Sequence, residues 1–80
     1  MESDIRALLN RIRWDERCDL SQLEVSYVDR GRPGDVNVAR GDDIVDVMQH
    51  FFRTAEGMIP FHRIIEIRYD GEVLFAREHG

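Results

Sequence analysis

The strongest constraint on the fold is a long β-prone run, residues 58–67, which holds a proline and a His-Arg pair among apolar residues. Successive side chains of a strand point to opposite faces, so an uninterrupted strand places Arg63 on the apolar face and His62 on the other. Pro60 offers an alternative, because a proline inside a sheet lies at an edge or at a bulge. A bulge there would turn His62 inward and Arg63 outward.

An arginine on the apolar face needs a partner, since an unpaired charge is costly to bury. In residues 21–29, apolar side chains alternate with polar ones, as in a half-buried strand. Asp29 lies on the same face as the apolar residues of this segment, which are Leu23, Val25 and Tyr27. We therefore predict that Asp29 forms an ion pair with Arg63 at one end of the core.

The N-terminal segment is predicted to be a helix over residues 4–13, with Ser3 as its N-cap. Its apolar residues recur at the spacing of one helical face: Ile5, Leu8, Leu9 and Ile12. Trp14 follows directly, at a position where a tryptophan either packs at the edge of a core or stacks on a nucleic-acid base.

Two hairpins are predicted from turn residues. The first joins residues 21–29 to a short strand at 36–39, because Pro33-Gly34 suits the centre of a type II turn. The second joins residues 58–67 to residues 73–77 through Asp-Gly at 70–71, which is typical of a tight hairpin.

The remaining segments are less regular. Residues 51–54 have strand composition, and residues 43–48 fit either a short helix or an extended segment. Residues 78–80 are predicted to fray. We therefore expect one α+β domain over residues 1–80, with an N-terminal helix packed on a four- to five-stranded, mostly antiparallel sheet built from two hairpins.

Composition narrows the function classes. The single cysteine, Cys18, rules out an intramolecular disulfide framework, and no apolar run approaches the roughly 20 residues that cross a bilayer. These features predict a cytoplasmic protein without a membrane contact. The net charge of −5 argues against a broad non-specific nucleic-acid footprint. All eleven basic residues are arginine, which excludes a P-loop lysine and a Schiff-base lysine.

The His62-Arg63 pair is the most suggestive candidate for binding a phosphate. Histidine exchanges a proton near neutral pH, and the planar arginine fork matches two phosphate oxygens. Arg30 and Arg32, on a glycine-containing turn, could add further forks and exposed backbone N–H groups. The structural alternative is a solvated histidine, an ion-paired arginine and an ordinary charged turn.

Other chemistry finds less support. Asp42, Asp46 and His50 are spaced by four and would line one face of a helix, but no further metal ligand is evident. The serines and Cys18 form no nucleophile motif. We therefore predict no catalytic residue, no metal and no cofactor.

Four short motifs follow one another over nearly the whole chain: Ile12-Arg13-Trp14-Asp15, Tyr27-Val28-Asp29-Arg30-Gly31, Ile59-Pro60-Phe61-His62-Arg63-Ile64 and Gly71-Glu72-Val73-Leu74-Phe75. In this order they resemble a family of small archaeal proteins, which also occurs as a domain of larger eukaryotic proteins. That family has been proposed to recognise RNA ends bearing a cyclic phosphate, from its association with RNA-repair and RNA-processing domains.

The resemblance implies an RNA end as ligand and RNA-repair or RNA-processing proteins as partners. It highlights Trp14, Asp29, Arg30, His62 and Arg63, and it departs from the family at Phe75, where the family often has tryptophan. Phenylalanine keeps the bulk and the stacking surface but lacks the indole N–H.

These observations lead to the hypothesis of a non-catalytic RNA-binding module for phosphate-bearing ends, including 2′,3′-cyclic phosphates. His62 and either Arg30 or Arg63 would contact the phosphate, Asp29 would orient Arg63, and Trp14 or Phe61 would stack on a base. Two alternatives stay open. One is a minimal RNA phosphoesterase that uses His62, with His50 as the only plausible second histidine. The other is a structural or protein-interaction domain.

Overall fold

The computed structural model describes residues 2–31 and 33–77. Within these ranges the chain forms one α-helix, α1 (Glu2–Trp14), and seven strands: β1 (Leu23–Val28), β2 (Val36–Arg40), β3 (Ile44–Val47), β4 (Phe51–Thr54), β5 (Gly57–Pro60), β6 (Ile64–Tyr69) and β7 (Glu72–Ala76). Four 3-10 turns connect them: η1 (Leu20–Gln22), η2 (Pro33–Asp35), η3 (Gly41–Asp43) and η4 (Phe61–Arg63).

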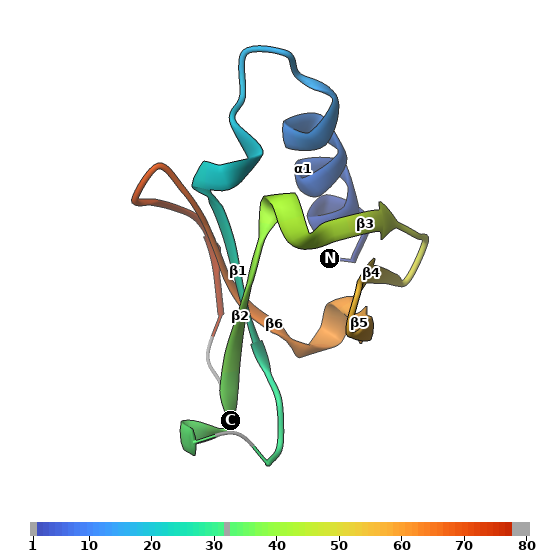
Figure 1. Cartoon of the computed structure of the whole chain (residues 1–80), viewed down its shortest axis with the longest axis vertical. Helices are drawn as coiled ribbons and strands as arrows, with labels where there is room; N and C mark the ends of the chain where they lie inside the picture. The colour runs from blue at the N-terminus through green and yellow to red at the C-terminus, as the bar shows by residue number, and fades with distance from the viewer. Residues whose placement is uncertain (1, 32, 78–80) are drawn as a thin grey trace.

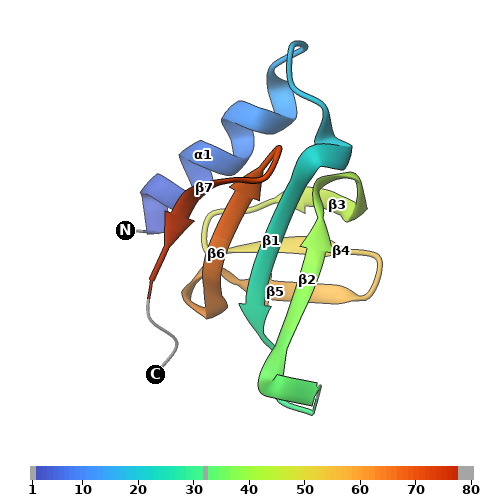
Figure 2. The same ribbon diagram turned by 90° about the vertical axis from the view of Figure 1, so that its left-hand side faces the viewer.

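The strands form two antiparallel sheets, one in the order β2-β1-β6-β7 and one in the order β3-β4-β5. The chain crosses between the sheets at two 3-10 turns, since η3 links β2 to β3 and η4 links β5 to β6. Figure 2 shows the three-stranded sheet lying behind the four-stranded sheet, with its strands running across those of the larger sheet. The predicted α+β class and the antiparallel arrangement are confirmed.

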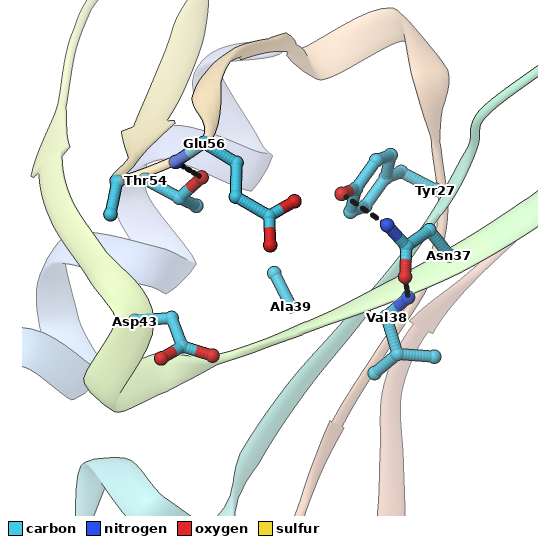
Figure 3. Close-up of a pocket in the computed structure, with 8 residues that line it drawn as sticks. Tyr27, Asn37, Val38, Ala39, Asp43, Thr54 and Glu56 are labelled. Carbon is cyan, nitrogen blue, oxygen red and sulfur yellow. Dashed lines mark hydrogen bonds between the residues drawn. The ribbon is translucent and has the colours of Figure 1, made fainter.

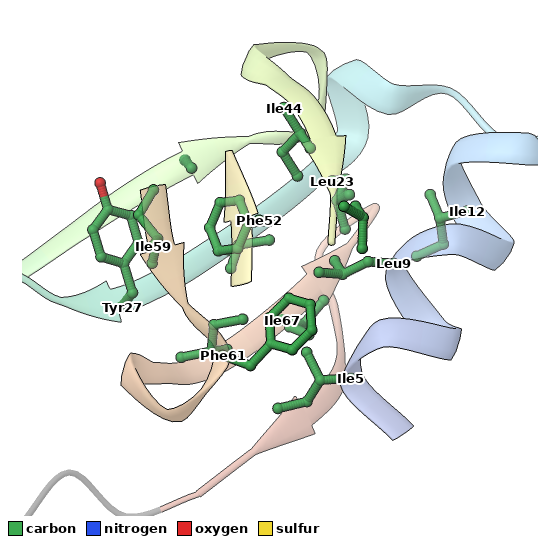
Figure 4. Packing of buried hydrophobic residues seen from close by; sticks show 14 residues of the cluster. Ile5, Leu9, Ile12, Leu23, Tyr27, Ile44, Phe52, Ile59, Phe61 and Ile67 are labelled. Carbon is green, nitrogen blue, oxygen red and sulfur yellow. The ribbon is translucent and has the colours of Figure 1, made fainter. Parts of the chain in front are cut away.

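The hydrophobic core lies between the two sheets and α1 (Figure 4). The helix contributes the buried side chains of Ile5, Leu9 and Ile12, which confirms the predicted helical face, while Leu8 is only partly buried. The helix begins at Glu2 rather than at residue 4, so Ser3 lies inside its first turn and is not the N-cap.

Both predicted hairpin turns are confirmed by the strand registers and the turn conformations, although the first strand of the second hairpin is shorter than predicted. Strands β1 and β2 pair through Tyr27 and Asn37, and Gly34 has φ 75° and ψ 3°, the third position of a type II turn. Strands β6 and β7 are joined at Asp70 and Gly71, with φ 52° and 80°, as in a type I′ turn. The predicted fraying of residues 78–80 lies outside the described residues.

The prediction of one strand over residues 58–67 is wrong. β5 ends at Pro60, the 3-10 turn η4 follows, and β6 begins at Ile64 in the other sheet. Pro60 has no N–H and lies on β5, an edge strand, as expected for a proline in a sheet. The turn buries Phe61 and leaves both His62 and Arg63 exposed, so Arg63 does not enter the core.

Residues 43–48 resolve as the extended alternative, because η3 is followed by β3, whose Ile44 and Val47 are buried. Gly41 begins η3 where the chain packs tightly on η1: a Cβ there would lie 2.5 Å from the carbonyl oxygen of Leu20. The extra strand and the split of residues 58–67 explain why the described chain has seven strands instead of four or five.

Candidate nucleic-acid interface

The two motifs that suggested a phosphate site meet at one corner of the four-stranded sheet. The ladder between β1 and β6 ends at the pair Tyr27 and Ile64. Arg63 directly precedes that pair on η4, and Asp29 and Arg30 follow it closely on the other chain segment. This corner, formed by η4 and residues 29–31, is called the η4 corner below.

The backbone of η4 is fixed by contacts from distant parts of the chain. The Phe61 ring is fully buried, and the Phe61 N–H donates to the carbonyl oxygen of His50 at 3.0 Å. The Arg77 guanidinium then donates from Nη2 to the Phe61 carbonyl oxygen at 2.7 Å and from Nε to the Ile64 carbonyl oxygen at 2.6 Å. The exposed side chains of His62 and Arg63 therefore project from a braced backbone.

Arg77 is a residue that sequence reasoning missed. It was expected only as the end of the last strand, and its partners are backbone carbonyls 13 and 16 positions away. Because carbonyl acceptors belong to every residue, no local motif marks such a contact. Its guanidinium also lies 5.6 Å from the centre of the Phe75 ring.

Arg63 lines a pocket of about 160 Å³ between the end of β1 and the β4–β5 hairpin. The same pocket is lined by Asp29 and Glu56. A second pocket, of about 260 Å³, shares Tyr27, Thr54 and Glu56 with the first, so the two adjoin. Figure 3 shows this second pocket, with the Glu56 carboxylate pointing into the space between the hairpin and β2.

A hydrogen-bonded group holds the wall shared by the two pockets. The Asn37 amide Nδ2 donates to the Tyr27 hydroxyl at 3.1 Å and to Asp29 Oδ2 at 3.3 Å. Tyr27 is only 8% exposed and packs edge-on against Phe52. On the hairpin, the Glu56 N–H donates to Thr54 Oγ1 at 3.2 Å, which shapes the turn that carries the Glu56 side chain.

The structure corrects the reasoning behind the predicted ion pair. Asp29 and Arg63 do line one pocket, as neighbours at the end of the core. However, a buried ion pair requires the guanidinium on the apolar face, and Arg63 is exposed. The Asn37 amide donates to the Asp29 carboxylate at 3.3 Å. The Asp29–Arg63 pair itself stays a prediction.

Trp14 is not brought to the η4 corner. It is the last residue of α1 and is 75% exposed, so the expectation that it packs at the core edge is wrong. The Arg13 guanidinium lies 5.4 Å from the centre of its ring. Figures 1 and 2 show the loop after α1 at the opposite end of the molecule from the β1–β2 turn, along its longest dimension of 35 Å.

The other candidate residues do not form a further cluster. Arg30 is exposed beside the η4 corner, whereas Arg32 lies outside the described residues. Asp42 lies on η3, Asp46 on β3 and His50 after it, so the helical face that would have gathered them does not exist. No cluster of three or more potential metal ligands occurs among residues 2–31 and 33–77.

The shifted carboxyl groups lie away from the η4 corner, in the loop after α1. The side-chain hydrogen bond from Arg17 lowers the pKa of Asp15, and the hydroxyl of Ser21 lowers the pKa of Asp19. Both effects come from residues two positions away in the sequence. They stabilise the loop locally.

The η4 corner thus presents an exposed imidazole and an exposed guanidinium on consecutive residues, and the guanidinium lines a pocket with polar walls. These groups can donate hydrogen bonds to phosphate oxygens. The model of the MJ1316 RNA cyclic group end recognition domain matches residues 2–77. The chain belongs to this family. The match spans both sheets, the helix and the whole η4 corner.

Archaeal relatives agree with this membership. A protein of Archaeoglobus fulgidus named UPF0248 protein is 37% identical over 70 residues, which cover 86% of this chain and 99% of the relative. A UPF0248 protein of Pyrobaculum islandicum is 36% identical over 81 residues, covering 95% and 92%. No solved structure is significantly similar to the chain. Among the residues described, no helix is long and apolar enough to span a membrane.

Proposed function

We propose that the protein is a non-catalytic RNA-binding module that recognises a phosphate-bearing RNA end at the η4 corner. The observation that carries this proposal is the 3-10 turn, which turns both His62 and Arg63 to solvent. In a continuous strand these neighbours would point to opposite faces. Here the pair is exposed on a backbone held by Arg77 and by the buried Phe61 ring.

Each residue has a defined role in the proposal. The Arg63 guanidinium donates hydrogen bonds to two phosphate oxygens, and His62 donates a further hydrogen bond. Arg30, exposed on the adjoining turn, adds positive charge for the phosphate of the preceding nucleotide. A net charge of −5 disfavours contacts along a nucleic-acid backbone, so a few local contacts at an end fit this chain better than a long footprint.

The structure changes which aromatic residues can stack on a base. Phe61 is fully buried and cannot stack on a base. Trp14 is exposed, but its distance from the η4 corner means that it could only contact a nucleotide farther along the strand. The phosphate contacts are therefore the main source of end recognition in this proposal.

The family description, RNA cyclic group end recognition, supports the class of ligand. The test is fluorescence anisotropy with one short labelled RNA prepared with a 2′,3′-cyclic phosphate, a 3′-phosphate or a 3′-hydroxyl end. We expect saturable binding of a phosphate-bearing end and weaker binding of the hydroxyl end. Arg63→Gln should weaken binding by about tenfold or more, as expected for the loss of a charge-assisted bidentate contact.

Arg11→Gln is the matched control, because it removes the same charge from an exposed position of α1. If both arginine variants weaken binding equally, the effect is one of overall charge and the η4 corner is not the site. Equal binding of all three RNA ends by the wild-type protein would overturn the proposed function.

A minimal phosphoesterase is the second candidate, and one contact favours it. The hydrogen bond from the Phe61 N–H to the His50 carbonyl oxygen brings the backbones of two exposed histidines, His50 and His62, to adjacent positions. Opening a cyclic phosphate normally uses two proton-transfer groups. Conversion of the cyclic end to a linear monoester, abolished in His62→Ala, would favour this enzyme over the binding module.

A further inference from the structure

Strand β5 has an open edge beside the η4 corner. It is the last strand of the sheet β3-β4-β5, so within the described chain only β4 pairs with it (Figure 2). Its consecutive residues 57–59 line the pocket of about 160 Å³ that Arg63 also lines. Consecutive side chains of a strand point to opposite faces, so a pocket lined by all three residues runs along the backbone edge of the strand.

The strand register determines which main-chain groups face this edge. The Phe61 N–H donates to the His50 carbonyl oxygen at 3.0 Å, which makes residues 50 and 61 a hydrogen-bonded pair. Hydrogen-bonded and non-hydrogen-bonded pairs alternate along an antiparallel ladder. Along the β4–β5 register, Arg53 and Met58 therefore form a non-hydrogen-bonded pair. The N–H and the C=O of Met58 consequently both point away from β4, toward the open edge.

Two other edge strands cover an outward N–H group in a way that β5 does not. On β2 and β3 the N–H donates to the side-chain oxygen of the preceding residue, at 2.8 Å to Asn37 and at 2.9 Å to Asp46. Met58 follows Gly57, which has no side chain and has φ 146°, a conformation that other residues rarely adopt. No hydrogen bond from elsewhere in residues 2–31 and 33–77 covers the Met58 N–H.

The edge of β5 offers one donor and one acceptor side by side. By the same alternation Gly57 and Ile59 turn these groups toward β4, and Pro60 has no N–H. A peptide strand would therefore gain few hydrogen bonds here. An unpaired nucleobase carries an adjacent donor and acceptor on its base-pairing edge, and proteins read single-stranded RNA through such edges. A pocket of about 160 Å³ suits one planar ring better than a strand.

Resting on the function proposed above, we propose that the open edge of β5 at Met58 binds the base of the terminal nucleotide. The Met58 N–H donates to the acceptor of the base, and the Met58 C=O accepts from its donor. Main-chain groups carry no net charge, so this contact does not depend on the charge balance of the side chains around the pocket.

One nucleotide can meet both sites. The base and the 2′,3′-cyclic phosphate belong to the same ribose, and Met58 and Arg63 line the same pocket. Each of the four RNA bases has an adjacent donor and acceptor when it is unpaired, so the contact selects an unpaired end and not one particular base. The ligand class is therefore a single-stranded RNA end.

The first experiment compares two RNAs that end in a 2′,3′-cyclic phosphate, one with uridine and one with N3-methyluridine as the last nucleotide. The methyl group removes the donor and obstructs the base-pairing edge, but it keeps the ring, the ribose and the phosphate. We expect the methylated end to bind about fivefold more weakly, as for the loss of hydrogen bonds to neutral main-chain groups. The same methylation at the third nucleotide from the end is the matched control and should leave the affinity unchanged.

The second experiment follows the Met58 amide by hydrogen exchange in NMR spectra. In the free protein this amide should exchange faster than the Ile59 amide, which bonds within the ladder. Saturation with the uridine end should slow its exchange by about tenfold, and saturation with the methylated end should not. Slowing that grows with protein concentration in the absence of RNA would mean that the edge pairs with a second copy of the chain, which would overturn the proposal.

Two variants separate the main chain of Met58 from its side chain. Met58→Pro removes an N–H that lies outside the ladder, and Pro60, two residues on, shows that this edge accepts a proline. Met58→Ala keeps both main-chain groups and shortens a side chain that is 64% exposed. The preference for uridine should fall to about twofold or less in Met58→Pro and stay near fivefold in Met58→Ala. Equal loss in both variants would assign the effect to the side chain and contradict the proposal. If the urea midpoint shows that Met58→Pro is unfolded, the hydrogen exchange of the wild-type protein decides.

These results are distinguishable from a failure of the proposed function. If phosphate-bearing ends bind better than the hydroxyl end, but the uridine and N3-methyluridine ends bind equally, the base contact at Met58 is wrong and end recognition stands. If phosphate-bearing ends bind no better than the hydroxyl end, the proposed function fails, whichever base ends the RNA.

Discussion

The η4 corner and the loop after α1 both present exposed charged residues, but the contacts of those side chains differ. In the loop, Asp15 bonds to Arg17 and Asp19 bonds to Ser21, each two residues away. At the corner, η4 is held by Arg77 from far along the chain and by an aromatic ring in the core. Exposed charge alone therefore does not distinguish a candidate site. The place of the charged side chains in the fold also matters. The loop also lines a pocket, and the Tyr69 hydroxyl holds the Asp19 N–H there. The corner differs in presenting the exposed His62-Arg63 pair on a backbone that Arg77 braces.

The largest expected effect is the difference in unfolding free energy between two aromatic variants, one at Phe61 of the η4 corner and one at Trp14 beside the loop. Phe61→Ala should lower the free energy of unfolding by about 3–5 kcal/mol, because it leaves a cavity where a fully buried ring stood. Trp14→Ala should change it by about 0.5 kcal/mol or less, since that ring is 75% exposed. Urea denaturation of both variants measures the difference. A similar loss of unfolding free energy in both variants would contradict this difference between the two regions.

The second effect compares one arginine from each region, Arg77 and Arg17. Arg77→Met should lower the free energy of unfolding by about 3 kcal/mol, because two partly buried carbonyl groups lose charged donors. It should also weaken binding of the phosphate-bearing RNA end, since η4 loses its brace. Arg17→Met is the matched change in the loop; it should lower the urea midpoint only slightly, because its contact with Asp15 is exposed, and should leave RNA binding at the wild-type value. An unaltered midpoint in Arg77→Met would contradict the bracing role.

The smallest effect is a pH dependence confined to the loop. The hydrogen bond from the Arg17 side chain holds the pKa of Asp15 below its ordinary value of 3.8. A lowered pKa in the folded state means that the interaction stabilises the fold above that ordinary value and stops doing so as the pH falls through the folded pKa. Titration of the Asp15 carboxyl by NMR should show the lowered midpoint, and Arg17→Met should return it toward 3.8. A midpoint unaffected by that variant would rule out the Arg17 contact as its cause.

Much of the fold follows from local patterns. The helical face of α1, the Pro-Gly turn between β1 and β2 and the Asp-Gly turn between β6 and β7 each depend on residues close in sequence. Such patterns carry their own conformational preference, so they could be recognised without knowledge of the rest of the molecule.

The break at η4 could not be predicted in the same way. Pro60 raised the question of a bulge, but the outcome depends on the Phe61 ring entering the core and on hydrogen bonds to His50 and Arg77. These contacts join segments far apart in the chain. Strand alternation consequently placed Arg63 on the wrong side, and the pocket at Glu56 had no signal in the sequence, because it forms only where two hairpins meet.

The grouping of the candidate residues was predicted in part. His62, Arg63, Asp29 and Arg30 were singled out from residue types and from the family resemblance, and the β1–β6 register brings them to one corner. Trp14 was singled out with them, yet it lies at the end of α1, away from that corner. Residues singled out by the same set of motifs can therefore lie far apart in the fold. The strand register shows which of them lie together.

The most direct test of the central claim is an amide chemical-shift titration of the labelled protein with a dinucleotide that ends in a 2′,3′-cyclic phosphate. The account predicts that the largest changes fall on residues 61–64 and 29–31, with little change at Trp14 and residues 15–19. Saturable changes centred on the loop after α1, or none at the η4 corner under conditions where the dinucleotide binds, would contradict it.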